Sequence, residues 1–315
     1  MTNVVIKTEN LVKRYGALTA VNGLSLEVYE GEIFGFLGPN GAGKTTSINM
    51  LCGLLRPDAG RVLVRGVPMD GGTAETRTRV GMCPQTIVLW ERLTCLEQLE
   101  FMGQMYGLSG DRARRRSLKL LDDLDLADSR NKQARTLSGG MQRRLNLAMA
   151  LVHDPEIVVL DEPEAGLDPQ SRVRVREYLQ SLARHKTVIL TTHNMDEADR
   201  VVDRVAIIDH GELLELDTPE ALKQRVGEGD VIEICLAEGR HDEAGARSAL
   251  AGLAAEVRLE PAAHTLRVRA LNAVGQLADI LAALARAGIQ PSDVNIRANT
   301  LEDVFLKLTG RRLRE

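Results

Sequence analysis

A glycine-rich loop that directly follows a short apolar run constrains this chain more than any other feature of its sequence. The apolar run is residues 33–37 and the loop is residues 38–46. A buried strand, a glycine-rich turn and a helix that begins near the end of the turn form the setting in which such a loop binds phosphate. We therefore expect an α/β protein with a phosphorylated ligand. The loop residues are Gly38, Pro39, Asn40, Gly41, Ala42, Gly43, Lys44, Thr45 and Thr46.

Each residue type in this loop suits phosphate binding. The glycines lack a Cβ, so the backbone can turn successive N–H groups inward around an anion. The helix start adds unsatisfied N–H donors and partial positive charge. Lys44 is expected to reach the β- and γ-phosphates, and the Thr45 hydroxyl is a hard oxygen ligand that suits Mg²⁺. The alternative, a turn that binds nothing, is disfavoured because the strand and the complete motif are both present.

Length and composition fit one large domain and one small domain. The chain has 315 residues, of which 27% are charged and 44% hydrophobic, as in ordinary globular proteins. Its formal charge of −4 argues against nucleic acid as the main partner. No apolar run approaches the roughly 18 residues that span a bilayer, and residues 1–7 lack the layout of a secretory signal. The sequence therefore predicts a cytoplasmic location.

Two carboxylates follow the apolar run 157–160. In an open α/β sheet, ligands bind at the carboxyl ends of the strands, so Asp161 and Glu162 are expected to face the phosphate loop. Asp161 is expected to hold Mg²⁺ through its water shell, and Glu162 to orient or deprotonate an attacking water. The alternative, in which these acids and Pro163 only cap the next element, is disfavoured by the matching loop upstream.

Polar side chains also follow two other apolar runs. Gln85 comes after residues 80–84, and His193 comes after residues 187–192. Taken alone, such a glutamine is usually a surface residue and such a histidine is more often structural. In the company of the loop and the two carboxylates, His193 has the position to hydrogen-bond a γ-phosphate.

A second helix start that suits phosphate lies at residues 137–142. Ser138 is a natural N-cap, and Gly139 and Gly140 allow another group to approach the helix closely. Seen alone, this would be an ordinary capped helix. Two such helix starts in one chain are less ordinary.

Tyr15 lies in residues 12–16, which we interpret as a turn between two strand-like segments. An exposed ring upstream of a phosphate loop can stack on an adenine base. The alternative is a packing role, which is the commoner one for a single tyrosine.

The pattern changes after residue 226, where Gly227 to Asp230 indicate a linker. The sequence predicts a nucleotide-binding domain over residues 1–226, with a helical subdomain at about 86–153, and an accessory domain over 227–315. The accessory domain is expected to be a small α+β sandwich with a split βαβ order, and it offers no phosphate loop and no catalytic pairing. Its predicted elements are strand 231–236, helix 243–253, strands near 257 and 266–268, helix 273–287, strand 293–297 and a helix from 301.

These motifs together resemble those of the ATP-binding subunits of ABC transporters over nearly the whole chain. The resemblance implies a P-loop NTPase core of the ABC ATPase type with a helical subdomain. Loop 38–46 is similar to the Walker A motif, Gln85 to the Q-loop, residues 137–142 to the family signature, Asp161 and Glu162 to the Walker B aspartate and catalytic glutamate, Gly166 to Asp168 to the D-loop, His193 to the switch histidine, and Tyr15 to the adenine-stacking aromatic residue.

The resemblance also implies the ligands and the assembly. It implies ATP and Mg²⁺ as cofactors and two copies that face each other head to tail, with a homodimer expected. Lys44 of one copy and Ser138 and Gly140 of the other would hold each ATP. The implied catalytic residues are Glu162, His193 and Gln85, the metal ligands Thr45, Gln85 and Asp161, and the ATP contacts Tyr15, the loop 38–46, Ser138, Gly139, Gly140 and Asp168.

Residues 301–310 are similar to the ending of the daunorubicin-resistance and nodulation-factor export ATPases. That subfamily implies a separately encoded membrane permease, export of a drug, lipid or glycolipid-like compound, and a peripheral place on the inner face of the cell membrane. Residues 84–94 resemble the surface that docks the permease. Trp90 there is either an exposed interface anchor or a core residue.

One position departs from the family pattern. Glu164 stands where the family usually has a small hydroxyl or neutral residue, and its charge is expected to repel a bound triphosphate by on the order of 1 kcal/mol.

A soluble ABC ATPase acting on nucleic acid or ribosomes is the first rival function. Lys44 and Ser138 lie too close in sequence for the long coiled coils of DNA-repair members, and the chain has one cassette, whereas translation-factor members have two. A non-catalytic nucleotide sensor is disfavoured by Glu162 and His193.

Overall fold

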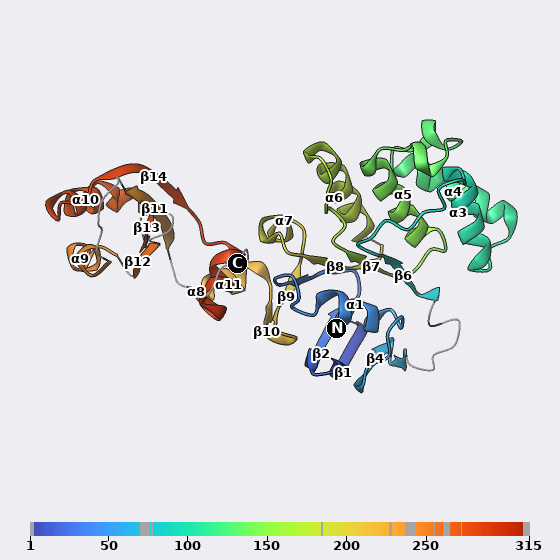
Figure 1. Ribbon diagram of the computed structural model, residues 1–315, viewed down its shortest axis with the longest axis horizontal. Helices are drawn as coiled ribbons and strands as arrows, with labels where there is room; N and C mark the ends of the chain where they lie inside the picture. Colours follow the sequence, from blue (N-terminus) through green and yellow to red (C-terminus); the bar gives the residue numbers. More distant parts are fainter. Residues whose placement is uncertain are drawn as a thin grey trace. The chain divides into compact units, whose positions relative to one another are not determined.

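The computed structural model describes residues 3–69, 76, 78–183, 185–226, 229–236, 243–254, 256–260, 265–271 and 273–310. They form two compact units, the first ending at Pro219 and the second beginning at Glu220. In the first unit, a six-stranded sheet and a four-stranded sheet share the core with the helices between and around them (Figure 1).

The six-stranded sheet has the order β10-β9-β3-β8-β7-β6, and only β10 runs antiparallel to its neighbour. Every residue of β3 and β7 is buried. Parallel strands that are covered on both faces have continuous apolar sequences, and this is why the sequence predicts them well. The strands are β3 (Ile33–Leu37), β6 (Val80–Cys83), β7 (Ile157–Asp161), β8 (Thr187–Thr192), β9 (Arg204–Asp209) and β10 (Glu212–Asp217).

The four-stranded sheet is antiparallel and has the order β2-β1-β4-β5. Helix α1 (Lys44–Leu51) contacts both β2 and β7 and so lies between the two sheets (Figure 1). The strands are β1 (Val4–Tyr15), β2 (Leu18–Tyr29), β4 (Ala59–Val64) and β5 (Val67–Pro68).

The expected turn at residues 12–16 is wrong for Tyr15, which is the last residue of β1 and pairs with Leu18 of β2. The turn itself is shorter and contains Gly16, whose φ is 59°. Several register shifts interrupt the pairing of β1 with β2. They break the strict alternation by which a strand is recognised in a sequence.

Helices α3, α4 and α5 form a group beside β6 (Figure 1), within the predicted helical subdomain. Helix α3 begins with a capping box of Thr94 and Glu97, and Ser138 caps α5 as its sequence predicts. Among the described residues, no helix combines the length and apolar character that a bilayer span requires. The helices are α3 (Cys95–Met105), α4 (Gly110–Asp123), α5 (Gly139–Leu151), α6 (Pro169–Ala183) and α7 (Met195–Asp199), with short 3-10 turns at Ala127–Ser129 and Ala134–Thr136.

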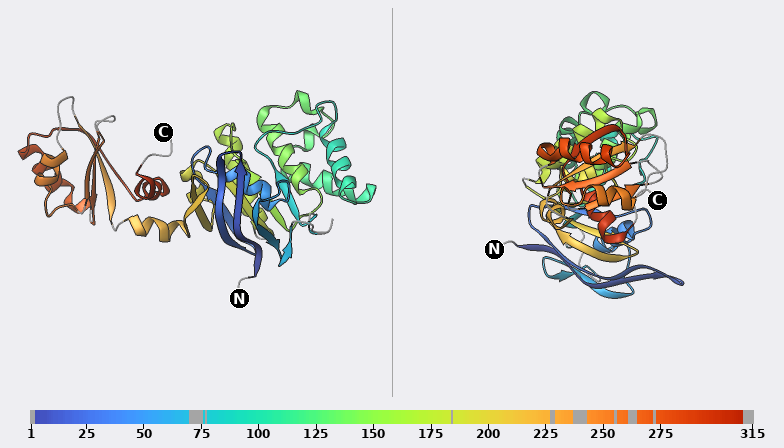
Figure 2. Two further views of the ribbon diagram at one scale, coloured as in Figure 1. Left: turned by 60° about the horizontal axis from the view of Figure 1, so that its bottom comes forward. Right: turned by 90° about the vertical axis from the view of Figure 1, so that its left-hand side faces the viewer.

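The second unit has the predicted strand–helix–strand–strand–helix–strand order and a final helix. Its antiparallel sheet has the order β12-β13-β11-β14, and α9 and α10 lie side by side on one face of it (Figure 2). The elements are α8 (Pro219–Val226), β11 (Asp230–Leu236), α9 (Glu243–Ala249), β12 (Glu256–Glu260), β13 (Thr265–Ala270), α10 (Ala273–Arg286), β14 (Pro291–Arg297) and α11 (Leu301–Thr309).

Helix α8 belongs to the second unit because it is bonded to α11. Lys307 donates to the carbonyl oxygens of Arg225 and Val226 at 2.9 and 3.1 Å. The division after Pro219 therefore falls before the boundary at 226/227 that the sequence predicts, and that domain boundary stays a prediction.

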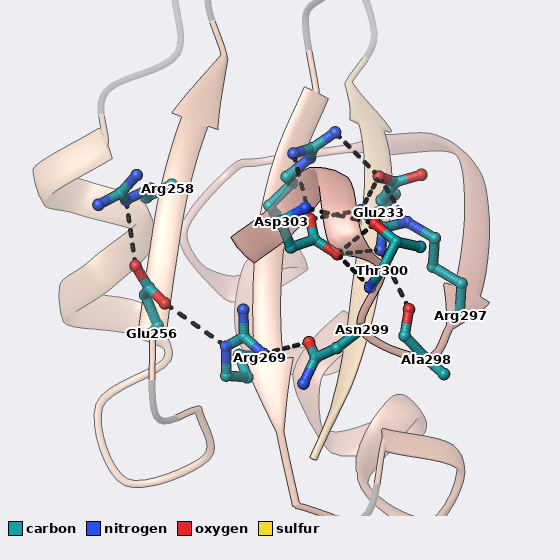
Figure 3. Close-up of polar contacts among 10 residues, drawn as sticks. Glu233, Glu256, Arg258, Arg269, Arg297, Ala298, Asn299, Thr300 and Asp303 are labelled. Atoms are coloured by element: carbon teal, nitrogen blue, oxygen red, sulfur yellow. Dashed lines mark hydrogen bonds and ion pairs between the residues drawn. The ribbon is translucent and has the colours of Figure 1, made fainter. Parts of the chain in front are cut away.

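An ion-pair network fastens the start of α11 to this sheet (Figure 3). Arg297 makes a bidentate contact with Asp303, with nitrogen–oxygen distances of 2.6 and 2.9 Å, and also reaches Glu233 at 3.0 Å. Asp303 forms a capping box with Thr300 at the helix start. The segment that resembles the subfamily's ending is thus an anchored structural element.

Candidate functional site

The carboxyl ends of four adjacent strands carry the predicted phosphate-binding and catalytic residues. Loop 38–43 follows β3, and His193 follows β8. Asp161 and Glu162 lie at the end of β7, and Gln85 lies just beyond β6. Parallel strands place their carboxyl ends at one edge of the sheet. The fold therefore brings together residues that are far apart in the sequence.

The glycines of the loop are required by both backbone conformation and space. Gly41 and Gly43 have φ values of 82° and 99°, in the left-handed region that side chains disfavour. A Cβ on Gly43 would lie 2.3 Å from the carbonyl oxygen of Ala20. A Cβ on Gly38 would lie 2.1 Å from the carbonyl oxygen of Ile208. The loop can thus curl only with glycine at these positions.

Lys44 begins α1 and is buried, with 6% of its surface exposed. Its Nζ donates to the carbonyl oxygens of Gly38 and Pro39 at 2.6 and 2.9 Å. Burial lowers the pKa of Lys44, whereas the charges of Glu162 and Asp161 oppose this change. The ammonium group is therefore held in place inside the loop, next to two carboxylates.

Thr191 of β8 joins the two carboxylates of the site. Its hydroxyl donates to Asp161 Oδ1 at 2.5 Å and accepts from the backbone N–H of Glu162 at 3.0 Å. Thr191 is not among the site residues that the sequence predicts. The only available signal was a polar residue near the end of an apolar run, and its pairing with Asp161 depends on the strand register.

Glu162 is the centre of a hydrogen-bonded group formed by the three residues predicted to be catalytic. Its Oε1 lies 2.9 Å from His193 Nδ1, and its Oε2 accepts from Gln85 Nε2 at 3.0 Å. Glu162 is buried, whereas His193 and Gln85 are exposed to solvent. The arrangement orients a buried carboxylate from two sides, which is what a group that positions or deprotonates water needs.

The predicted metal ligands provide the oxygen atoms that Mg²⁺ prefers. They are the exposed hydroxyl of Thr45, the buried carboxylate of Asp161 and the amide of Gln85. The nitrogen of that amide is the donor to Glu162, so its oxygen is the atom that a metal ion would contact. A hydroxyl, a carboxylate and an amide oxygen match the chemistry of a hard divalent cation.

Ser138 and Gly139 are exposed at the start of α5, and the Ser138 hydroxyl accepts from the N–H of Met141 at 3.3 Å. A Cβ on Gly140 would lie 3.0 Å from Ser171 Oγ and 3.7 Å from Asp168 Oδ2. The predicted D-loop aspartate therefore lies beside the signature helix.

Asp168 caps α6. It accepts from the side-chain hydroxyl and the backbone N–H of Ser171 at 2.6 and 3.0 Å, and these hydrogen bonds lower the pKa of Asp168. Tyr15, the predicted adenine-stacking residue, has 51% of its surface exposed at the end of β1.

Glu164, which departs from the family pattern, lines a pocket of about 170 Å³ together with His193 and Glu197. Burial and repulsion by Glu197 raise the pKa of Glu164 to about 7, against the effects of Arg176 and Arg172. The carboxyl group therefore binds a proton more readily than a free glutamate does, which weakens the repulsion of triphosphate that its charge predicts.

Comparisons with known proteins place these features in a family. A family model described as ABC transporter matches residues 21–165. The chain is 42% identical to the daunorubicin resistance ATP-binding protein DrrA3 of Streptomyces coeruleorubidus, over 100% of this chain and 99% of the relative. It is 40% identical to the Nod factor export ATP-binding protein I of Ralstonia nicotianae, over 99% of this chain and 95% of the relative.

A solved structure extends the comparison to the fold. It is a dimeric ATP-binding cassette in a post-hydrolysis state with ADP and Pi, and it is 28% identical with a TM-score of 0.63. The match covers 68% of this chain and 98% of that one.

Proposed function

The chain belongs to the ATP-binding subunits of ABC transporters, in the subfamily of daunorubicin-resistance and Nod factor export proteins, and on that premise we propose that it powers export through a separate permease. The observation that carries the proposal is the contact of Glu162 with both His193 and Gln85 beside the phosphate loop. This group provides an oriented carboxylate where water must attack a γ-phosphate.

Different residues of the site have different roles in the proposed hydrolysis of ATP. Lys44 balances charge on the β- and γ-phosphates, and the backbone N–H groups of the loop bind their oxygens. Glu162 orients the attacking water and accepts its proton, while His193 and Gln85 fix the direction of that carboxylate. Mg²⁺, held through Thr45, Gln85 and Asp161, neutralises phosphate charge when it is bound.

Two copies of the chain are proposed to close around two ATP molecules. The helix start at Ser138 and Gly140 suits a phosphate but has no phosphate loop beside it, because the loop at Lys44 lies elsewhere in the fold. A head-to-tail dimer supplies each loop with the helix start of the other copy. The related dimeric cassette supports this assembly. ATP stabilises the closed dimer because only that state offers both sets of contacts.

An exposed apolar surface next to Gln85 is proposed to dock the permease. We call it the docking surface; its residues are Ile87, Val88, Trp90, Phe101 and Met105, with 37 to 69% of each exposed. The Trp90 and Phe101 rings meet edge to face with centroids 5.2 Å apart. Exposed aromatic groups of this kind are common at the centres of interfaces. The subunit would thereby lie on the inner face of the cell membrane.

The names of the relatives support a proposal for the cargo, since they refer to resistance to daunorubicin and to export of Nod factor. We propose a drug, lipid or glycolipid-like compound, selected by the permease. The rival function, a soluble ATPase acting on nucleic acid or ribosomes, is disfavoured by the net charge of −4.

The test is Mg²⁺-dependent ATPase activity of the purified chain, with and without membranes that contain the permease from the neighbouring gene. Glu162→Gln is the blank, and it should retain ATP and dimerise while losing turnover. Stimulation by the permease supports the transport function. Stimulation by ribosomes or nucleic acid alone would contradict it, and normal turnover of Glu162→Gln would remove the role given to Glu162.

A further inference from the structure

Arg143 lies on α5, one and a half turns after Ser138, and only 3% of its surface is exposed. Its guanidinium group contacts two separate segments of the candidate site. It donates to the carbonyl oxygens of Pro84 and Gln85 at 2.8 Å each, of Asp161 at 2.8 Å, of Glu162 at 2.5 Å and of Pro163 at 3.1 Å.

All five of these acceptors belong to the main chain, at the ends of β6 and β7. A guanidinium presents its N–H donors in a rigid planar fork, so one side chain can bond to several fixed carbonyl groups at once. Arg143 therefore holds the Gln85 segment and the Glu162 segment at a set spacing. Arg143 lies just beyond the signature-like residues 137–142 and is not among the site residues that the sequence predicts.

The backbone of Glu162 needs this support. Its φ is 46°, in the left-handed region that a residue with a side chain rarely adopts. Such a conformation persists where the surroundings determine it from several directions. Here Thr191 binds the N–H of Glu162 at 3.0 Å, and Arg143 binds its carbonyl oxygen.

We propose that Arg143 is the positioning residue for Glu162, and that it connects the helix start at Ser138 to the catalytic carboxylate of the same copy. The inference rests on the proposed function, because it takes Glu162 as the catalytic group and Ser138 as the contact to the second ATP. When Ser138 engages that ATP, movement of α5 reaches Glu162 and Gln85 through Arg143. The two ATP sites of the dimer are coupled by this side chain.

Arg143→Lys tests the inference because it keeps the charge but replaces the planar fork with one ammonium group. Arg144→Lys is the matched control. Arg144 is the next residue and is also buried, but it donates to the carbonyl oxygens of Leu124 and Asp125 at 2.7 and 3.0 Å, at the end of α4. Single-turnover hydrolysis is measured per bound ATP, so unfolded molecules do not contribute.

Arg143→Lys is expected to lower the turnover rate roughly 10- to 100-fold while the Kd of a fluorescent ATP analogue changes less than about threefold. Arg144→Lys should change both less than about threefold. In a Glu162→Gln background, Arg143→Lys should lower the residual rate less than about threefold, because its effect passes through Glu162. If the lysine variant does not fold, Arg143→Gln takes its place with the same expectations.

Two results would overturn the inference. One is an equal loss of rate in the wild-type and Glu162→Gln backgrounds, which indicates a general structural role. The other is normal turnover of Arg143→Lys while Glu162→Gln is inactive, which leaves the proposed function intact. Normal turnover of Glu162→Gln would instead remove the premise.

Discussion

His193 Nδ1 lies 2.9 Å from Glu162 Oε1, although the two residues are 31 positions apart in the chain. The strands that carry them, β8 and β7, are hydrogen-bonded neighbours, and each residue directly follows its strand. The exposed imidazole, with 53% of its side chain accessible, thus reaches a carboxylate of which only 9% is accessible.

His193→Ala should therefore lower the turnover rate about 10- to 100-fold, because Glu162 loses one of the two groups that orient it. ATP affinity should change less than about fivefold, since Lys44 and the loop remain. Steady-state hydrolysis and ATP binding are the measurements. His185→Ala, at an exposed histidine beyond the end of α6, is the control and should behave as wild type. Full activity of His193→Ala would contradict the arrangement.

Trp90→Ala should reduce stimulation of the ATPase by the permease about 10-fold and leave activity without permease within about twofold. The reason is that Trp90 is 43% exposed on the docking surface and belongs to none of the contacts around Glu162. Val274→Ala, at an exposed apolar residue of α10, is the matched control. A loss of basal activity equal to the loss of stimulation would argue against a docking role.

Glu164→Gln should stabilise the protein more at pH 8 than at pH 5. The pKa of Glu164 is about 7 in the fold, against 4.5 for a free side chain. The folded protein therefore binds more protons between these values, and stability falls as the pH rises through them. The cost of charging Glu164 grows as the pH rises through these values and amounts to about 1–2 kcal/mol at pH 8, after screening at this partly exposed site.

The measurement is urea unfolding of both proteins at pH 5 and pH 8. Glu97→Gln is the control because hydrogen bonds from Thr94 lower the pKa of Glu97, so its contribution changes only below pH 4.5. An equal effect of Glu164→Gln at both pH values would show that its charge carries no cost in the fold.

Arg297→Ala should destabilise the second unit by about 2–4 kcal/mol, because removal of one partner leaves a buried charge. Asp303, with 7% of its side chain exposed, would keep its hydrogen bonds from Thr300 but, as a charged partner among the described residues, would have the more distant Arg267 at 3.8 Å. Amide hydrogen exchange in residues 230–309 of the full chain measures the effect. Arg258→Ala is the control, since Arg258 is 54% exposed and pairs with Glu256 at 3.1 Å. Similar losses in both variants would show that burial of the network contributes nothing.

Local patterns in the sequence predict much of the fold. Apolar runs covered on both faces identify β3, β7 and β8, and capping residues identify the starts of α3 and α5. The strand and helix order of the second unit follows from alternation and helical periodicity. These signals are visible because each depends on residues that are close together in the chain.

Local patterns alone predict which side chains lie at strand ends, since a polar residue after an apolar run marks the edge of a buried sheet. They do not predict that Thr191 hydrogen-bonds to Asp161 or that Arg143 binds the backbone of Glu162. Those contacts depend on strand register and on the depth at which α5 packs, and neither leaves a local pattern. In the sequence, Arg143 cannot be told from an exposed basic residue of a helix. Only the tertiary structure shows that it is buried among carbonyl groups.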